Sequence, residues 1–226
     1  IEQAAELALN ENVRVLGISD FNTIEGFDEF AEACGRHAIL PLFNIEFIAF
    51  SERDKKEGKR WNDPQNPGVM YYCGKALAHP STFSDDSRSR LRNLWQGTQD
   101  HIWQVIHKLS DYLCGIAVPL ALDYNRIRAT YTRGTVRERH LARALADALR
   151  ERYPDQEKLR AVLRDVFADR AAKVDVTDDV ALQNELRARL LKAGKPAFVE
   201  EDPSAFLSVE EVRRLGLDGG GIPGYP

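Results

Sequence analysis

The sequence predicts an α/β fold that carries a large helical insertion. Two short, nearly continuous apolar segments, residues 13–18 and 39–50, flank a segment of helical periodicity at 27–37. Continuous apolar runs are typical of strands that are buried on both faces of a parallel sheet. Beyond residue 100, the apolar residues have the spacing of amphipathic helices. Together these observations predict parallel βα units followed by a mainly helical region.

Residues 1–80 are predicted to form the α/β portion. Residues 2–12 have the spacing of a short helix, and a further strand is expected at 69–77. Residues 51–68 are charged and then rich in Asn, Pro and Gly, which is typical of a loop. A strand, a helix and a second strand with short connections favour a right-handed crossover between parallel strands.

Residues 81–216 are predicted to be a mainly helical insertion, and residues 217–226 to begin a returning strand of a barrel. Residues 81–93 are rich in Ser and Arg and are expected to be mobile. Apolar spacing then predicts helices at 101–114, 135–152, 155–171, 178–193 and 208–215.

Polar residues mark the predicted starts of three of these helices. Asp100 and Ser208 stand just before an apolar stripe, where a side-chain oxygen can accept from a free backbone N–H group. Thr135 is followed three residues later by Glu138, which is the pattern of a capping box.

The composition is that of an ordinary globular protein. The 226 residues are 43% hydrophobic and 29% charged, with a formal net charge of −4, which gives no global reason to expect a nucleic-acid partner. No apolar run approaches the roughly 20 residues that span a bilayer. No signal peptide begins the sequence, so no membrane partner is expected. The widely spaced Cys34, Cys73 and Cys114 predict free thiols in a reducing cytoplasm.

Two carboxylates stand out at the ends of the first two predicted strands. Asp20 closely follows the first strand and precedes Thr23 and Gly26, and Glu46 lies within the otherwise apolar second strand. An ionised carboxylate is rarely buried alone, so a metal ion, a hydrogen-bond network or a basic side chain is expected nearby. The carboxyl ends of strands are where α/β folds collect functional residues.

The pattern of Asp20, Thr23, Gly26 and Glu46 resembles the polymerase and histidinol phosphatase (PHP) family of metal-dependent phosphoesterases. In that family one strand ends in Thr-Asp-His-Asp-Thr, a Gly opens the next helix, and the following strand ends in Gly-x-Glu. The resemblance covers about residues 13–50. It implies a PHP-type distorted (β/α) barrel, hydrolysis of a phosphoester, and a divalent Mn, Zn or Fe ion as cofactor.

The sequence departs from the family pattern at several positions, among them Ser19, Phe21 and Asn44. Phe21 stands where the family has a metal-binding His, and Asn44 replaces the usual Gly. The resemblance also implies a fragment, because the family's His-x-His motif would lie before Ile1 and its Asp-x-His motif after Pro226. The sequence therefore leaves three interpretations open: a divergent metal-dependent hydrolase, a non-catalytic PHP-derived module that has lost its metal, and an unrelated α/β binding protein.

The resemblance implies roles for three residues. Glu46 would be a catalytic residue and a metal ligand, Asp20 a catalytic residue that supports it, and His79 a second metal ligand placed after the predicted strand at 69–77. Pro80 would hold His79 extended at the end of that strand. Each residue has a structural alternative. Glu46 could pair with an arginine, Asp20 could form a turn with its own backbone, and His79 could be an ordinary loop histidine.

Arginines are concentrated around the predicted helix at 135–152. The start of a helix attracts anions through its free N–H groups and its dipole. Arg133, Arg137 and His140 are therefore candidate contacts to a phosphorylated small molecule or phosphoester substrate. The alternative is a solvated basic helix with acidic partners. The arginines of this segment are Arg126, Arg128, Arg133, Arg137, Arg139 and Arg143.

Overall fold

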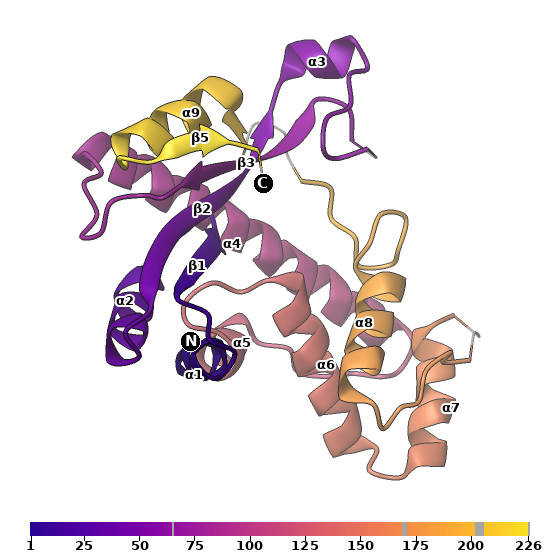
Figure 1. The fold of residues 1–226 in the computed structure, drawn as a ribbon. Helices are drawn as coiled ribbons and strands as arrows, with labels where there is room; N and C mark the ends of the chain where they lie inside the picture. The colour runs from indigo at the N-terminus through magenta and orange to yellow at the C-terminus, as the bar shows by residue number, and fades with distance from the viewer. Residues whose placement is uncertain (65, 169–170, 202–205, 226) are drawn as a thin grey trace. The chain divides into compact units, whose positions relative to one another are not determined.

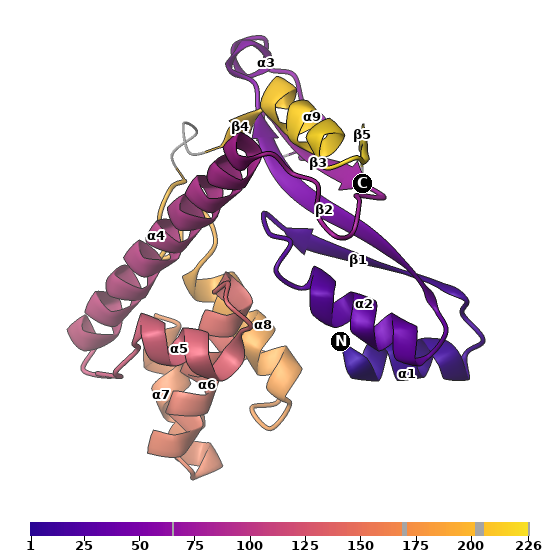
Figure 2. The same ribbon diagram turned by 90° about the vertical axis from the view of Figure 1, so that its left-hand side faces the viewer.

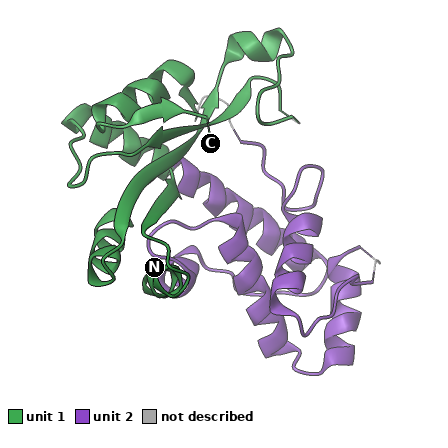
Figure 3. Ribbon diagram, viewed as in Figure 1, with its two compact units in different colours: residues 1–96, 202–226 green, residues 97–201 purple. Residues whose placement is uncertain are grey.

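The chain forms two compact units, residues 1–96 with 202–226, and residues 97–201 (Figure 3). The boundary between them falls within helix α4 (Asp85–Gly115). The compact helical unit thus begins later and ends earlier than the predicted insertion at 81–216. The structure is a computed structural model, and it describes residues 1–64, 66–168, 171–201 and 206–225.

The first unit is built on a sheet with the strand order β1–β2–β3–β5 (Figure 1). A short strand, β4, pairs with the end of β2. β1 and β2 are parallel and are joined through helix α2 (Phe27–Arg36), as the strand–helix–strand pattern predicts. The strands are β1 (Val15–Phe21), β2 (Leu40–Phe50), β3 (Val69–Lys75), β4 (Leu207–Ser208) and β5 (Ile222–Gly224).

The sheet is mixed, which corrects the prediction of a wholly parallel sheet. β3 is antiparallel to β2, and β5 is antiparallel to β3. The chain between β2 and β3 holds helix α3 (Glu52–Lys56) and returns to its starting point, where the Ser51 N–H donates to the Gly68 carbonyl at 2.8 Å. A Cβ atom added at Gly68 would lie only 2.6 Å from the backbone carbonyl oxygen of Ser51, so this closure requires glycine.

A returning connection produces an antiparallel pair, because a parallel neighbour needs a crossover from one end of the sheet to the other. Within the described strands, the order runs from β1 to β5 without closing on itself, so the predicted barrel is not confirmed. The predicted returning strand at 217–226 corresponds to β5, and its last residue, 226, lies outside the described residues.

Alternation along β2 separates a core face from an open face. Successive side chains of a strand point to opposite faces. The side chains of the core face are buried and pack on α2. There the ring of Phe43 lies 5.0 Å from that of Phe27 and 5.9 Å from that of Phe30. The buried residues are Phe43, Ile45, Phe47 and Ala49, and the half-buried residues of the open face are Asn44, Glu46, Ile48 and Phe50.

Helix α1 (Glu2–Asn10) packs against α2 beside β1 and β2 (Figure 2). Its contact surface is made of the small residues Ala5 and Ala8, which are buried in the same core cluster as Ala33 and Cys34 of α2. Small residues let two helices approach closely, so the positions of α1 and α2 are fixed by dense packing.

The predicted cap of the last helix is confirmed. Helix α9 (Val209–Asp218) begins after Ser208, whose hydroxyl accepts from the Glu211 N–H at 3.3 Å. The Glu211 carboxylate in turn accepts from the Ser208 N–H at 2.9 Å, which completes a capping box.

The expectation that residues 81–93 are mobile is wrong for most of the segment. Helix α4 begins at Asp85, and it buries Leu91 and Leu94 in the core of the first unit. Asp100 lies inside this helix and does not begin one. The sequence signal was weak because the first turns of α4 carry mainly Ser, Arg and Asp, which leaves only these two leucines to mark the buried face.

The second unit is helical and has its own core. Its helices are the later part of α4, α5 (Tyr124–Tyr131), α6 (Glu138–Arg152), α7 (Gln156–Val166) and α8 (Asp179–Leu190). The predicted helix at 155–171 is shorter in the structure, and residues 169–170 lie outside the described part of the chain. None of the described helices is both long enough and apolar enough to cross a bilayer.

Removing a core side chain of α6 should destabilise the second unit. Leu141 is 0% exposed, so Leu141→Ala removes buried apolar surface and leaves a cavity. We expect its free energy of unfolding in urea, followed by far-UV circular dichroism, to fall by about 2–5 kcal/mol. The control Val180→Ala, at a side chain that is 68% exposed on α8, should change it by less than about 0.5 kcal/mol. Equal effects of the two changes would contradict the assigned core.

Candidate active site

Glu46 lies in a pocket on the open face of the sheet. The pocket, here called the Glu46 pocket, has a volume of about 430 Å³ and is lined by Glu46, Asn62, Tyr71 and Tyr225. Glu46 comes from β2 and Tyr71 from β3, while Asn62 follows α3 and Tyr225 follows β5. Small-molecule sites typically measure about 300–1,000 Å³. The carboxylate therefore faces a space that is large enough for a ligand.

The walls of the Glu46 pocket are held by local contacts. The Asn62 side chain donates to the Tyr71 carbonyl at 2.9 Å and accepts from the Tyr71 N–H at 2.8 Å, so it extends the edge of β3 as a backbone would. Beside it, the ring of Trp61 stacks on that of Tyr225 at 6.4 Å. Sequence analysis did not identify these residues, because only the antiparallel pairing of β3 and β5 brings position 225 near position 71.

The strand register defines the immediate neighbours of Glu46. Phe21 is its partner on β1 and Cys73 its partner on β3. Paired residues on adjacent strands point to the same face of a sheet. Burial raises the pKa of the Cys73 thiol, and the negative charge of Glu46 raises it further. Cys73 is therefore a protonated thiol at neutral pH and a poor nucleophile.

Asn44 occupies a position where the PHP pattern has Gly, and its side chain joins three strands. Its Nδ2 donates to the Ile18 carbonyl of β1 at 2.8 Å. Its Oδ1 accepts from the Ala76 N–H, just beyond β3, at 3.0 Å. Asn44 thus ties the two neighbours of β2 together next to Glu46.

Asp20 lies on the opposite side of the sheet from Glu46. Its partner in the register is Ile45, which is 0% exposed in the core. A Cβ atom at Gly26, the residue before α2, would lie 2.7 Å from Asp20 Oδ2. The carboxylate therefore sits against the start of α2, where the helix dipole favours negative charge. The structure does not bring Asp20 and Glu46 together on one face.

His79 also lies on the core side of the sheet. Its ring stacks on Phe43, with centroids 4.5 Å apart and an interplanar angle of 27°. Its Nε2 is 3.6 Å from an Asp28 carboxylate oxygen of α2. Phe43 belongs to the buried face of β2 and Glu46 to the open face. The structure therefore does not bring together the predicted metal pair of Glu46 and His79.

The residues around Glu46 do not by themselves fit a catalytic metal ion. The paired Phe21 supplies no ligand atom, and Cys73 is held in its protonated form. In the part of the chain that the structure describes, the one group of three metal-ligating side chains that could meet at an ion is Glu2, Glu6 and His37. We therefore assign no metal chemistry to the side chains around Glu46.

In the second unit, His140 caps helix α6. Its Nδ1 accepts a hydrogen bond from the Arg137 N–H at 3.1 Å. Burial lowers the pKa of His140 to about 4, and the charges of Arg139, Arg137 and Arg143 lower it further. The ring is therefore neutral at pH 7 and acts as an acceptor.

The helix that His140 caps begins at Glu138 and not at the predicted Thr135. Glu138 does not form the predicted capping box. Its carboxylate instead accepts from Arg187 at 2.9 Å and from Lys192 at 2.6 Å. These bonds connect the start of α6 to the end of α8 and the residues after it.

The two other predicted substrate contacts, Arg133 and Arg137, flank the start of α6. Arg133 is exposed and Arg137 is half-buried at the residue before the helix. Both arginines belong to the second unit, whereas Glu46 belongs to the first.

The fold is similar to two solved structures of hydrolase type. A Bifidobacterium adolescentis protein assigned as a metal-dependent phosphoesterase matches 98% of this chain with a TM-score of 0.60 and 18% identity. An amidohydrolase from Chromobacterium violaceum, with bound sulfate and no metal, matches 97% with a TM-score of 0.56 and 15% identity. The chain spans 59% and 58% of these structures. It thus has a mixed α/β fold of the kind found in phosphoesterases and amidohydrolases.

A short segment of the chain also matches a DNA polymerase subunit in sequence. The chain is 44% identical over 45 residues to DNA polymerase III subunit alpha of Staphylococcus aureus strains N315 and COL. The match covers 20% of this chain and 4% of the polymerase subunit. That subunit contains a PHP domain, the family that residues 13–50 resemble. No family model matches the sequence.

The capping role of His140 predicts a dependence of stability on pH. Its folded pKa of about 4 lies below the ordinary value of 6.5, so the unfolded chain binds more protons between these pH values. The free energy of unfolding should therefore fall as the pH drops from about 6.5 towards 4. His140→Gln keeps a capping acceptor without this titration, so urea denaturation across that range should show a shallower fall. Equal pH slopes for the two proteins would contradict the assignment.

Proposed function

We propose that this chain is part of a hydrolase that acts on a phosphoester, and that the Glu46 pocket is part of its substrate site. The observation that carries the proposal is the likeness of nearly the whole chain to a protein assigned as a metal-dependent phosphoesterase. The short match to a polymerase subunit with a PHP domain supports the same family. The activity and substrate of the whole protein are part of the proposal, since the chain spans 59% of that phosphoesterase structure.

The Glu46 pocket offers two kinds of contact to such a substrate. The aromatic walls formed by Tyr71 and Tyr225 suit the organic part of a phosphoester. Glu46 supplies a carboxylate, which repels a phosphate group at close range unless a cation lies between them. The family resemblance implies a divalent Mn, Zn or Fe ion, but among the described side chains that line the pocket or pair with Glu46, only Glu46 itself offers a carboxylate or imidazole. The other ligands of such an ion would have to come from outside this group.

A second candidate function is a non-catalytic, PHP-derived binding module. It is favoured by Phe21, which faces Glu46 in the register and carries no ligand atom. It is also favoured by the arginines around the start of α6, Arg133, Arg137, Arg139 and Arg143. In this alternative, Arg133 and Arg137 bind the phosphate of a phosphorylated ligand. His140 supports them as a helix cap and does not itself contact the ligand.

Replacing the pocket carboxylate should abolish hydrolysis. Glu46→Gln keeps the size of the side chain and removes its charge. We expect kcat/KM for bis(p-nitrophenyl) phosphate, measured with added Mn²⁺, to fall by about 10²-fold or more. The matched control is Glu52→Gln on α3, whose exposed carboxylate pairs with Lys56 at 3.1 Å outside the pocket, and its activity should stay unchanged.

The outcomes separate the two candidate functions. Equal hydrolysis by the wild type and by folded Glu46→Gln would refute a catalytic role for this pocket. A wild type that binds a phosphorylated ligand but releases no p-nitrophenol with Mn²⁺, Zn²⁺ or Fe²⁺ would support the binding module.

The binding module predicts that the double substitution Arg133→Ala and Arg137→Ala weakens anion binding. A hydrogen bond to a charged group contributes about 1.5–3 kcal/mol, so losing two should raise the Kd for inorganic pyrophosphate by about 100-fold or more. Isothermal titration calorimetry measures this change. The control is Arg160→Ala on α7, an exposed arginine that lies 3.5 Å from Asp175. An unchanged Kd in the double variant would exclude the site.

A further inference from the structure

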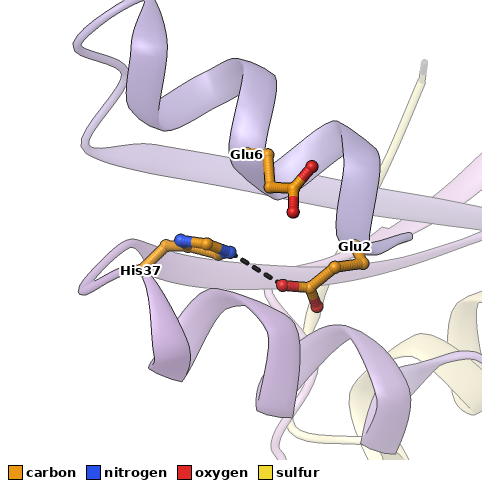
Figure 4. A group of neighbouring side chains, drawn as sticks. All are labelled: Glu2, Glu6 and His37. Atoms are coloured by element: carbon orange, nitrogen blue, oxygen red, sulfur yellow. Dashed lines mark hydrogen bonds and ion pairs between the residues drawn. The ribbon is translucent and has the colours of Figure 1, made fainter.

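Two carboxylates and an imidazole converge between α1 and α2 (Figure 4). Glu2 and Glu6 are four residues apart on α1, so they lie on the same face of the helix. His37 follows the last residue of α2, and its ring points at both glutamates. One ligand atom from each residue lies within 4.8 Å of the other two. A donor set drawn from two separate helices therefore meets at one point.

We propose that Glu2, Glu6 and His37 form a binding site for a divalent transition-metal ion of the Zn²⁺ type, which fastens α1 to α2. Two carboxylate oxygens and one imidazole nitrogen are ligands that Zn²⁺ accepts, and a water molecule completes a tetrahedral set. The site goes beyond the proposed hydrolase function, which does not use these residues.

The site is held in place before any ion binds. Ala5 of α1 is 0% exposed, as are Ala33 and Cys34 of α2, so dense packing fixes the two helices. The side chain of His37 is 18% exposed, and its Nε2 already lies 2.8 Å from a Glu2 oxygen. Because the ligands are already close together, little conformational freedom is lost when an ion enters.

Arg36 orients one of the ligands. Its guanidinium donates to Glu2 Oε2, while Glu2 Oε1 faces His37. Arg36 Nε also lies 3.5 Å from Oε1, so an ion would replace the His37 contact on Oε1 while Arg36 stays on Oε2, as outer partners of metal-binding carboxylates do.

The cluster lies at the other end of β2 from the Glu46 pocket. His37 precedes the first residue of β2, Leu40, and Glu46 comes six residues after Leu40. A strand rises about 3.3 Å per residue, so these six residues span roughly 20 Å. An ion held by His37 is therefore distinct from any ion near Glu46, and its effect is on the packing of α1.

The test is metal binding by the full 226-residue chain after treatment with a chelator. Zn²⁺ affinity is measured by calorimetry, Co²⁺ binding by visible absorption, and Tm with and without Zn²⁺. We expect one ion per chain and a higher Tm with Zn²⁺. Glu6→Gln and His37→Ala should each weaken this site by about tenfold or more. The control Glu32→Gln, on α2 with a carboxylate 4.0 Å from Arg36, should bind like the wild type.

Two further comparisons make the result decisive. Glu46→Ala should keep the Zn²⁺ site, so failure of the hydrolase proposal and failure of this one give different results. Glu6 is exposed, so Glu6→Gln tests the site even if His37→Ala fails to fold. Zn²⁺ affinity that is the same in wild type and Glu6→Gln, or a Tm that does not respond to Zn²⁺, would overturn the proposal.

Discussion

The first unit depends on the hydrogen bonding of β2 along both of its edges. β1 fixes one edge in a parallel register and β3 fixes the other in an antiparallel register. Because side chains alternate along a strand, this double register determines that Ile45 and Phe47 enter the core while Glu46 faces the pocket. A slip of one residue would exchange the two faces and bury the carboxylate.

Asn44 reinforces this register by a specific contact. It stands next to Ile45 and bonds to the backbones on both sides of β2, at Ile18 and Ala76. A slipped strand would leave these polar groups without partners, at a cost of about 1–3 kcal/mol for each buried group. The Asn44 side chain thus supports the alignment of β2 that presents Glu46.

Local patterns in the sequence predicted the parts of the fold that local forces determine. The parallel pairing of β1 and β2 and the cap at Ser208 depend on residues close together in the chain, and both are confirmed. The antiparallel direction of β3 depends on the hydrogen bond between Ser51 and Gly68, and the spacing of apolar residues does not predict such a bond. The predicted start of α6 was wrong, because His140, and not Glu138, accepts the hydrogen bond from the backbone N–H of the residue before the helix.

The candidate site was predicted only in part, for a geometric reason. Glu46 was singled out because it interrupts an otherwise apolar strand, and the alternation of β2 places it on the half-buried face. Asp20 was assigned to the same site by the resemblance to the PHP pattern, with the first strand expected to end at residue 18. β1 in fact continues to Phe21, so alternation runs through Asp20 and turns it to the other face. The aromatic residue Tyr225 is far along the chain and could be placed only by strand pairing.

Because the segment between Ser51 and Gly68 is closed by a hydrogen bond at its base, its residues can change without changing the fold of the sheet. The residues between them, 52–67, begin and end one hydrogen bond apart. They supply Asn62 to the pocket and Trp61, which stacks on the pocket residue Tyr225. Doubling the length of such a loop costs only about 0.6 kcal/mol in closure entropy. Insertions and exchanges in this segment can therefore accumulate while β2 and Glu46 keep their positions. Related chains could acquire different ligand preferences by changing this segment alone, with the same sheet beneath it.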